Sequence, residues 1–395
     1  MTKDFFTYQA QTGPTPLGLE IARAKGSYIY NTQGKRYLDF VAGVSANALG
    51  HQPACVTKAI TDQLERYTHV MVYGEFIQER PLALAKLLAT HLPDPLQSVY
   101  LTNSGTEATE GALKLAKRIT GKSEIIAAVN AYHGNTMGAM SVAGAEHTKS
   151  AFRPLIPGTK HLRFNNVKDL EIISHHTAAV ILETIQGGAG FIVPDEGYLQ
   201  KLKERCEETD TLLILDEIQS GMGRTGRLFE FMNHGIVPDI IITGKGLGGG
   251  MPIGAFIASK EHMAYLSHNP KMGHITTFGG HPVIAAAAYA TLDEILHSGL
   301  MNDIREKEQL IRKKLVHPAI KEIRGKGLML AAMVSTPELA TQIILKTLDK
   351  GLILFWLLFE GRAIRITPPL NISMEELNEG CDILLESINE VIDLK

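Results

Sequence analysis

Residues 212–255, LLILDEIQSGMGRTGRLFEFMNHGIVPDIIITGKGLGGGMPIGA, decide the fold of this chain. Two short aliphatic runs, 211–215 and 239–242, lie at its start and near its middle. Continuous rather than alternating apolar runs are typical of strands buried on both faces of a sheet. Asp216 directly follows the first run, and Lys245 closely follows the second. The stretch therefore predicts two buried strands that carry an acid and an amine to one edge of a sheet.

Working outward, three more apolar runs of the same kind precede this stretch and alternate with helical patterns: 98–101, 124–129 and 178–182. This alternation predicts an α/β fold with a mostly parallel sheet and crossover helices. These runs also end in polar or glycine-rich groups, namely Asn103-Ser104-Gly105-Thr106, Tyr132-His133-Gly134 and Glu183. Ligands of open α/β sheets bind outside the carboxyl ends of the strands. We therefore expect all five segments to contribute to one site.

The pattern differs at the two ends of the chain. GSYIYNTQGKRYLDF, residues 26–40, predicts a hairpin, and a helical pattern follows at about 54–67. After about residue 285, long helical patterns surround two strand-like runs, 322–334 and 361–373. We expect a large domain at 51–285 and a smaller α+β domain at 286–395, joined by the N-terminal segment 1–50.

Composition excludes several classes of protein. With 395 residues, the chain is long for one hydrophobic core. Its 39 Lys and Arg residues against 42 Asp and Glu give a net charge of −3, which gives no reason to expect a nucleic-acid partner. Three scattered cysteines fit neither a metal site nor a disulfide framework. The start lacks a signal peptide and the longest apolar run, 352–359, is too short to span a bilayer, so we expect a cytoplasmic protein without a membrane partner.

Lys245 and Asp216 suit the chemistry of pyridoxal 5′-phosphate (PLP). This cofactor needs a lysine that holds it as a Schiff base and an acid that keeps its ring nitrogen protonated. Glycines flank Lys245, and an apolar setting would lower the pKa of its amine. The alternatives are a surface lysine in a flexible loop and, for Asp216, a helix N-cap.

The cofactor also needs groups that bind its phosphate and a side chain that stacks on its ring. Ser104-Gly105-Thr106 precedes a helical pattern, and helix N-termini bind phosphate. The alternative is a plain capping box of Ser104 with Glu107. Tyr132 or His133 is a candidate to stack on the ring, and the alternative is ordinary core packing. Arg365 is a candidate to bind a carboxylate, and the alternative is a structural ion pair.

Other motifs in the chain are false signals. Residues 221–226 and 244–249 both fit G-x-G-x-x-G, but neither opens a helix directly after a strand, as a dinucleotide site requires. No H-E-x-x-H is present, and His175-His176 has no companion at ligand spacing. We expect neither dinucleotide nor metal binding.

Taken together, these residues resemble the class III (ornithine/acetylornithine-type, subgroup II) aminotransferases of PLP fold type I. The resemblance covers nearly the whole chain, and its motifs occur in family order. They are residues 212–255, YLDFVAGVSANALGH (37–51), TNSGTEATEGALKLAKR (102–118), AYHGNT (131–136), ILETIQG (181–187), TTFGGHP (276–282) and RGKGLM (324–329). The resemblance implies a large PLP-binding domain, a smaller α+β domain and PLP as the cofactor.

The resemblance also implies roles for the site residues. Ser104, Gly105 and Thr106 would hold the phosphate, and Thr277 would reach the phosphate of a neighbouring subunit's cofactor, which implies a homodimer with the site at its interface. The remaining cofactor contacts it implies are Tyr132 on the ring, Asp216 at the ring nitrogen, Gln219 at the phenolic oxygen, Glu183 near the ring and substrate, and Lys245 as imine lysine and proton shuttle.

Departures from the family pattern concern the substrate. Acetylornithine and ornithine members usually have arginine where this chain has Asn135, and ornithine members have tyrosine where it has Val44. The family's E-P-I-Q-G-E reads E-T-I-Q-G-G here, so Gly188 replaces the glutamate that gates the arginine corresponding to Arg365. Thr276 joins Arg365, Asn135 and Val44 as an expected substrate contact.

The resulting prediction is a ping-pong transamination from an ω-amino or amino-acid donor, of acetylornithine or ornithine type, to a keto acid such as 2-oxoglutarate. Three alternatives stay open. They are a PLP-dependent aminomutase or racemase, a different class III donor such as a diaminopelargonate-type amine or 4-aminobutyrate, and a non-catalytic descendant of the fold.

Overall fold

The computed structural model describes residues 2–393 and contains three sheets. The largest has the strand order β4-β10-β9-β8-β7-β5-β6. Its strands are β4 (Ser98–Thr102), β5 (Glu124–Ala128), β6 (Thr159–Leu162), β7 (Thr177–Glu183), β8 (Leu212–Asp216), β9 (Ile240–Gly244) and β10 (Gly254–Ala258). All neighbours pair in parallel except β10, which is antiparallel to both β9 and β4. The predicted mostly parallel sheet is confirmed.

Aliphatic residues on successive strand positions separate onto the two faces of this sheet. Ile240 and Ile242 pack with the helix α5 (Gly105–Thr120), whereas Ile241 between them packs in the core that includes α8 (Tyr198–Glu208). Side chains of a strand alternate between faces, so a continuous apolar run fills two cores at once. This explains why the predicted strands lack polar alternation.

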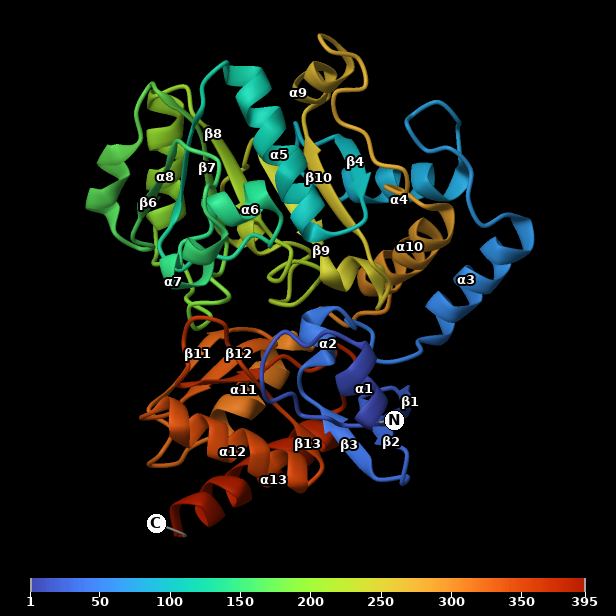
Figure 1. Ribbon diagram of the computed structural model, residues 1–395, viewed down its shortest axis with the longest axis vertical. Helices are drawn as coiled ribbons and strands as arrows, with labels where there is room; N and C mark the ends of the chain where they lie inside the picture. Colours follow the sequence, from blue (N-terminus) through green and yellow to red (C-terminus); the bar gives the residue numbers. More distant parts are fainter. Residues whose placement is uncertain (1, 394–395) are drawn as a thin grey trace.

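Further helices border the large sheet (Figure 1). They are α3 (Ala54–Arg66), α4 (Glu79–Thr90), α6 (Met137–Val142), α7 (Glu146–Lys149), α9 (Lys260–Ala264) and α10 (Pro282–His297), with the 3₁₀ turns η1 (Ser150–Phe152), η2 (Val167–Ile172), η3 (Glu230–Asn233), η4 (Lys245–Gly248) and η5 (Tyr265–Ser267). Helix α10 packs against α3 and α4, so it belongs with the large sheet. A domain boundary at 285/286 would cut this helix, and we propose that the boundary lies after His297.

The N-terminal segment and the C-terminal part of the chain lie together next to the large sheet, in the lower half of Figure 1. One sheet joins β1 (Ile21–Lys25), β2 (Tyr28–Asn31) and β3 (Arg36–Asp39) to β13 (Leu352–Ile353), and β13 pairs in parallel with β3. The other sheet, β11-β12-β15-β14, is antiparallel and comprises β11 (Glu322–Lys326), β12 (Met329–Met333), β15 (Ala363–Ile366) and β14 (Phe355–Trp356). The N-terminal segment therefore shares a sheet with the C-terminal part, as the sequence suggested.

The remaining helices are α1 (Thr2–Tyr8), α2 (Ala42–Ser45), α11 (Ile304–Lys314), α12 (Pro337–Asp349) and α13 (Met374–Asp393). Helix α13 packs against α11 and α12. None of the helices within residues 2–393 is long and apolar enough to cross a membrane.

Candidate active site

The carboxyl ends of β7, β8 and β9 and the start of α5 open onto one cavity of about 470 Å³. Glu183 ends β7 and Asp216 ends β8, and the two residues are opposite each other in the sheet. Lys245 directly follows β9. The predicted site residues that line the cavity are Val44, Gly105, Thr106, Tyr132, His133, Asn135, Glu183, Asp216, Gln219, Lys245 and Arg365.

Lys245 lines this cavity and is half-buried. Its φ of 41° is left-handed, a conformation that costs a non-glycine residue free energy and that clusters at functional sites. Burial, together with the positive charge of Arg365, lowers the pKa of its amine to about 8. Its Nζ donates a long hydrogen bond of 3.5 Å to Gln219 Oε1. The lowered pKa increases the uncharged fraction of Lys245 near neutral pH, as a nucleophilic amine requires.

Asp216 is fixed by two donors. His133 Nδ1 lies 2.7 Å from Asp216 Oδ2, and the backbone amide of Ile218 donates to Oδ1 at 3.0 Å. Burial by itself would lower the pKa of His133, but the hydrogen bond and the charge of Asp216 outweigh burial and raise it. His133 is therefore a hydrogen-bond partner of Asp216.

Glu183 is the second carboxyl group of the site and is half-buried. It accepts hydrogen bonds from the backbone amides of Tyr132 (3.1 Å) and Gly187 (2.9 Å). Burial raises its pKa to about 7. Glu183 can therefore hold or release a proton near neutral pH while it fixes the backbone of Tyr132.

The start of α5 is both a capped helix end and part of the cavity wall, so the two interpretations of its sequence are compatible. Ser104 Oγ caps the helix by accepting from the amide of Glu107 at 3.3 Å. Glu107 binds the amide of Asn103 at 2.8 Å, one residue before the position of a regular capping box. Gly105 and Thr106 meanwhile line the cavity. The first turn of α5 therefore presents its positive end to a ligand while Ser104 caps it.

Arg365 enters the cavity from β15 in the smaller part of the chain. Its side chain is buried, and Nε and Nη1 have no hydrogen-bond partner within the described part of the chain. Burial lowers the pKa of its guanidinium to about 10. Unpaired buried charge is costly, so this arginine is held ready for an anion. No carboxylate among residues 2–393 lies within salt-bridge distance of Arg365, so the alternative of a structural ion pair is not supported.

A left-handed turn brings Val44 and Ser45 to the site, and the sequence did not predict it. Ala42, Gly43, Val44 and Ser45 all have positive φ, from 50° to 68°. Asp39 Oδ1 accepts from the amides at the start of the turn, and Ser45 Oγ lies 3.4 Å from Gln219 Nε2. The turn places the β-branched side chain of Val44 on the cavity wall.

Sequence reasoning also missed the apolar residues of this wall. Phe355, Trp356, Leu358 and Ile185 line the cavity beside Arg365. Phe355 is directly opposite Arg365 in the β14–β15 pair. No local motif marks Phe355 and Trp356, because the pairing of β14 with β15 brings them to the site, whereas Ile185 lies in the 181–187 motif.

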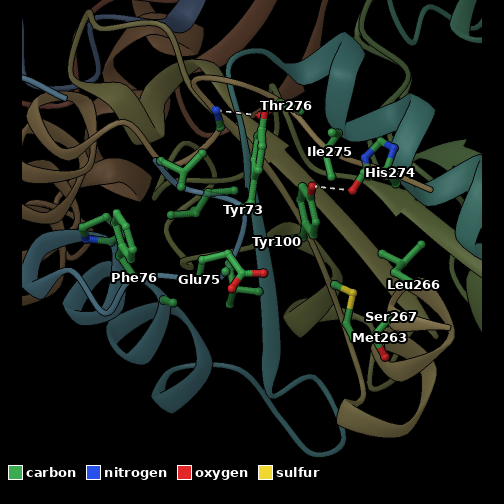
Figure 2. Close-up of a pocket in the computed structure, with 18 of the residues that line it drawn as sticks. Tyr73, Glu75, Phe76, Tyr100, Met263, Leu266, Ser267, His274, Ile275 and Thr276 are labelled. Carbon is green, nitrogen blue, oxygen red and sulfur yellow. Dashed lines mark hydrogen bonds between the residues drawn. The ribbon is translucent and has the colours of Figure 1, made fainter. Parts of the chain in front are cut away.

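Thr276 and Thr277 lie outside this cavity. Thr276 lines a larger one, of about 800 Å³, bordered by residues 72–82 and 263–280. Figure 2 shows Thr276 beside Tyr73, Tyr100 and His274, and its Oγ1 accepts from the amide of Gly279 at 2.6 Å. Thr277 is exposed. The structure therefore does not bring either threonine to Lys245 of the same chain.

The residues at the smaller cavity fit PLP. An amine with a lowered pKa, a buried aspartate held in place by a histidine, and a helix N-terminus line one cavity. These are the groups that a PLP ring and its phosphate require.

Comparison with known proteins agrees with this geometry. The family model "Aminotransferase class-III" matches residues 8–388. The chain belongs to the class III aminotransferases. It is therefore a PLP-dependent transferase with the fold of that family, as the resemblance predicted.

Relatives of this class III aminotransferase carry consistent names. The acetylornithine aminotransferase of Caldanaerobacter subterraneus is 36% identical, over 94% of this chain and 95% of the relative. That of Methanopyrus kandleri is 38% identical, over 92% of each. The crystal structure of Toxoplasma gondii ornithine aminotransferase superposes with a TM-score of 0.92 at 31% identity, covering 100% of this chain and 96% of the other.

Proposed function

We propose that this aminotransferase moves the amino group of an ω-amino or amino-acid donor, of acetylornithine or ornithine type, to a 2-oxo acid by a ping-pong mechanism. The donor loses its amino group and one hydrogen and gains the carbonyl oxygen, while the 2-oxo acid undergoes the reverse exchange, so no external oxidant is needed. The observation that carries the proposal is the amine of Lys245, with its lowered pKa, in the same cavity as the His133–Asp216 pair. The names of the relatives support the donor type.

Each residue of the cavity has a distinct task in this proposal. Bound PLP supplies the electron-accepting ring that stabilises negative charge at the reacting carbon. Lys245 would accept the proton from the donor carbon and donate it again, because its lowered pKa suits both directions. Asp216 would pair with the ring nitrogen, and Ser104, Gly105 and Thr106 would hold the phosphate. Tyr132 would stack on the ring, and Gln219 would bind its phenolic oxygen.

Substrate binding falls mainly to Arg365 in this proposal. Its unpaired guanidinium would bind the carboxylate of the 2-oxo acid, while Val44, Asn135 and the acid Glu183 contact the rest of the substrate. Both half-reactions use the same cavity, as a ping-pong mechanism requires.

We also propose that the functional unit is a homodimer and that the protein is cytoplasmic. Large apolar side chains are exposed around the larger cavity, among them Phe76, Leu82, Ile275 and Phe278, and Ile77 is 92% exposed. A second copy that covered this face would hide them and could bring Thr277 to the other copy's phosphate. Sedimentation of the PLP-loaded protein tests the dimer, and a monomer at micromolar concentration would refute it.

The function is tested with the visible spectrum of the purified protein during addition of single amino donors. A cofactor band that bleaches with one donor and returns with a 2-oxo acid is the expected result. Products that accumulate without any 2-oxo acid would instead indicate an aminomutase or racemase. A protein that takes up no PLP would refute the proposal altogether.

A further inference from the structure

The charges that line the cavity limit which 2-oxo acid can bind. The lysine and arginine side chains of its lining are Lys245 and Arg365. Lys245 is assigned to the cofactor, and His133 is buried with its Nδ1 against Asp216. Arg365 is therefore the cationic side chain that this chain leaves for a substrate carboxylate.

The structure also shows why Arg365 has no competing acid from the segment after β7. A Cβ atom added at Gly188 would lie 2.9 Å from the ring of Phe359 and 3.6 Å from Leu358. The amide of Phe359 donates to the carbonyl of Gly188 at 2.9 Å, so the two segments are held together. No side chain fits at position 188 without moving Phe359, and Arg365 stays open in both half-reactions.

One wall of the cavity is apolar and partly exposed, whereas the polar side chains of the lining, such as Asn135 and Gln219, carry no positive charge. Phe355 is directly across the strand pair from Arg365, and Leu358 is 57% exposed in the same cavity. Val44 and Ile185 continue this wall. A second carboxylate on the substrate would lie against these side chains without a counterion, which is costly in a partly buried site. The carboxyl groups of Glu183 and Asp216 also line the cavity and offer no counterion to a substrate carboxylate.

We propose that the 2-oxo acid used by this site carries a single carboxylate and an apolar side chain, as pyruvate and 2-oxobutyrate do, in preference to a dicarboxylate. The proposal rests on the transamination proposed above and deepens it. It replaces the 2-oxoglutarate expected from the sequence, because that compound has two carboxylates for one available arginine.

The test uses the amino acids that correspond to these oxo acids, so it does not require the physiological donor. The PLP-loaded enzyme is mixed with L-alanine, L-2-aminobutyrate or L-glutamate, and the loss of the cofactor band is followed in a single turnover. We expect second-order rate constants for the first two that exceed that of glutamate by at least about tenfold. A glutamate rate constant equal to or above that of alanine would overturn the inference and leave transamination intact.

A matched pair of variants tests the charge argument directly. Leu358→Arg adds a second cation to the apolar wall, and Leu358→Met keeps the wall apolar at similar volume. We expect the glutamate-to-alanine ratio of rate constants to rise about tenfold or more with arginine and to stay within about threefold with methionine. An equal rise in both variants, or none with arginine, would overturn the inference. If no amino or oxo acid reacts with the PLP-loaded enzyme, the proposed function itself fails.

Discussion

His133 Nδ1 lies 2.7 Å from Asp216 Oδ2, and both side chains are buried at the cavity. The histidine comes from the loop after β5 and the aspartate from the end of β8. Their contact fixes one carboxylate oxygen, and the amide of Ile218 fixes the other. Asp216 is thereby oriented toward the cavity before any ligand binds.

We predict that His133→Asn lowers kcat by about 10- to 100-fold, the range seen when a partner that orients a functional group is removed. KM should change much less, because His133 does not bind the substrate carboxylate. The measurement is steady-state kinetics together with the spectrum of the bound cofactor. His234→Asn is the matched control, since His234 is paired with the buried Glu230 away from the cavity. Equal losses in both variants would show that His133 acts only on stability.

Cofactor attachment should depend on pH through Lys245. The uncharged amine is the nucleophile, and its pKa is lowered to about 8 by burial and by the charge of Arg365. In cofactor-free protein, the rate of PLP attachment should therefore rise with pH and reach half its maximum near 8. Stopped-flow absorbance measures this rate.

Two variants sharpen the same experiment. Arg365→Met removes a positive charge, so the midpoint should move to higher pH. Lys245→Ala should attach no PLP covalently and should lose turnover by about 10²-fold or more. A midpoint that stays unchanged in Arg365→Met would contradict the assigned cause of the shift.

The strand ends that carry Asp216 and Lys245 were predictable from the sequence because short local patterns mark them. The aliphatic runs before Asp216 and Lys245 need no knowledge of the rest of the chain to be recognised as strands. Strand β10, GAFIA, was missed because its small residues and preceding glycines give little strand signal. The boundary proposed at 285/286 followed a change of pattern that falls inside helix α10.

The substrate side was less predictable because its signals are not local. The E-T-I-Q-G-G motif already indicated that Gly188 leaves Arg365 without an acid, but the packing of Gly188 against Phe359 joins two distant segments. The apolar wall depends on the pairing of β14 with β15. The role of His133 depends on a contact between two strand ends. Such facts arise from the packing of distant segments, and one sequence does not encode them as a motif.

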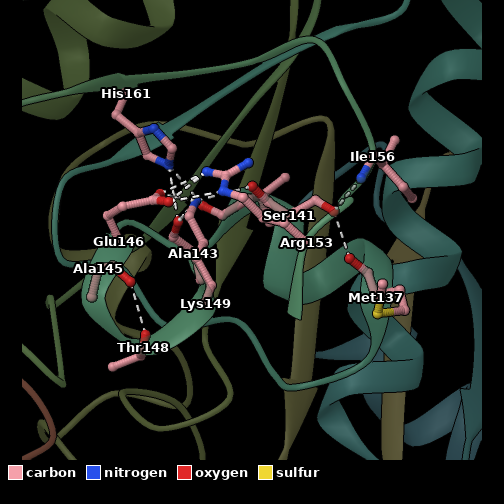
Figure 3. Close-up of polar contacts among 11 residues, drawn as sticks. Met137, Ser141, Ala143, Ala145, Glu146, Thr148, Lys149, Arg153, Ile156 and His161 are labelled. Carbon is pink, nitrogen blue, oxygen red and sulfur yellow. Dashed lines mark hydrogen bonds and ion pairs between the residues drawn. The ribbon is translucent and has the colours of Figure 1, made fainter. Parts of the chain in front are cut away.

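Lys149 should contribute to stability although it lies outside the cavity. Figure 3 shows it beside His161, Glu146 and Arg153 at the end of α6. Its Nζ donates to the carbonyls of Ala143 (2.5 Å) and Ser141 (3.4 Å), and His161 Nε2 also lies 3.1 Å from the carbonyl of Ala143.

Lys149→Met keeps the apolar stem but leaves these carbonyls short of a donor, so it should cost about 1–3 kcal/mol. The expected readout is a Tm lowered by a few degrees, measured by circular dichroism. Lys168→Met, at an exposed position, is the control and should change stability by no more than about 0.5 kcal/mol. Identical Tm values for the two variants would show that Lys149 does not support this end of α6.

Glu217 should make stability fall as pH rises. It is fully buried, accepts from the amides of Phe231 (2.7 Å) and Glu230 (3.1 Å) and from Ser220 Oγ (2.5 Å), and burial raises its pKa to about 7. The folded state holds this proton more tightly than the unfolded state, in which the pKa of a glutamate is near its ordinary value of 4.5, so the contribution is complete below that pH. The contribution is lost as pH rises toward 7, with a slope of at most about 1.4 kcal/mol per pH unit.

Glu217→Gln cannot titrate, and it replaces one acceptor oxygen with a donor NH2 group that faces other donors, so it should be less stable than the native protein at acidic pH. That deficit should shrink as pH rises from about 4.5 to about 7, because only the native protein bears the cost of a buried charge. Thermal unfolding of both proteins across this range measures the difference in Tm. Glu196→Gln, at an exposed position, should show no such trend. A Glu217→Gln deficit that stays constant with pH would mean that Glu217 is already ionised in the folded protein at pH 5, and that its two backbone amides and Ser220 outweigh its burial.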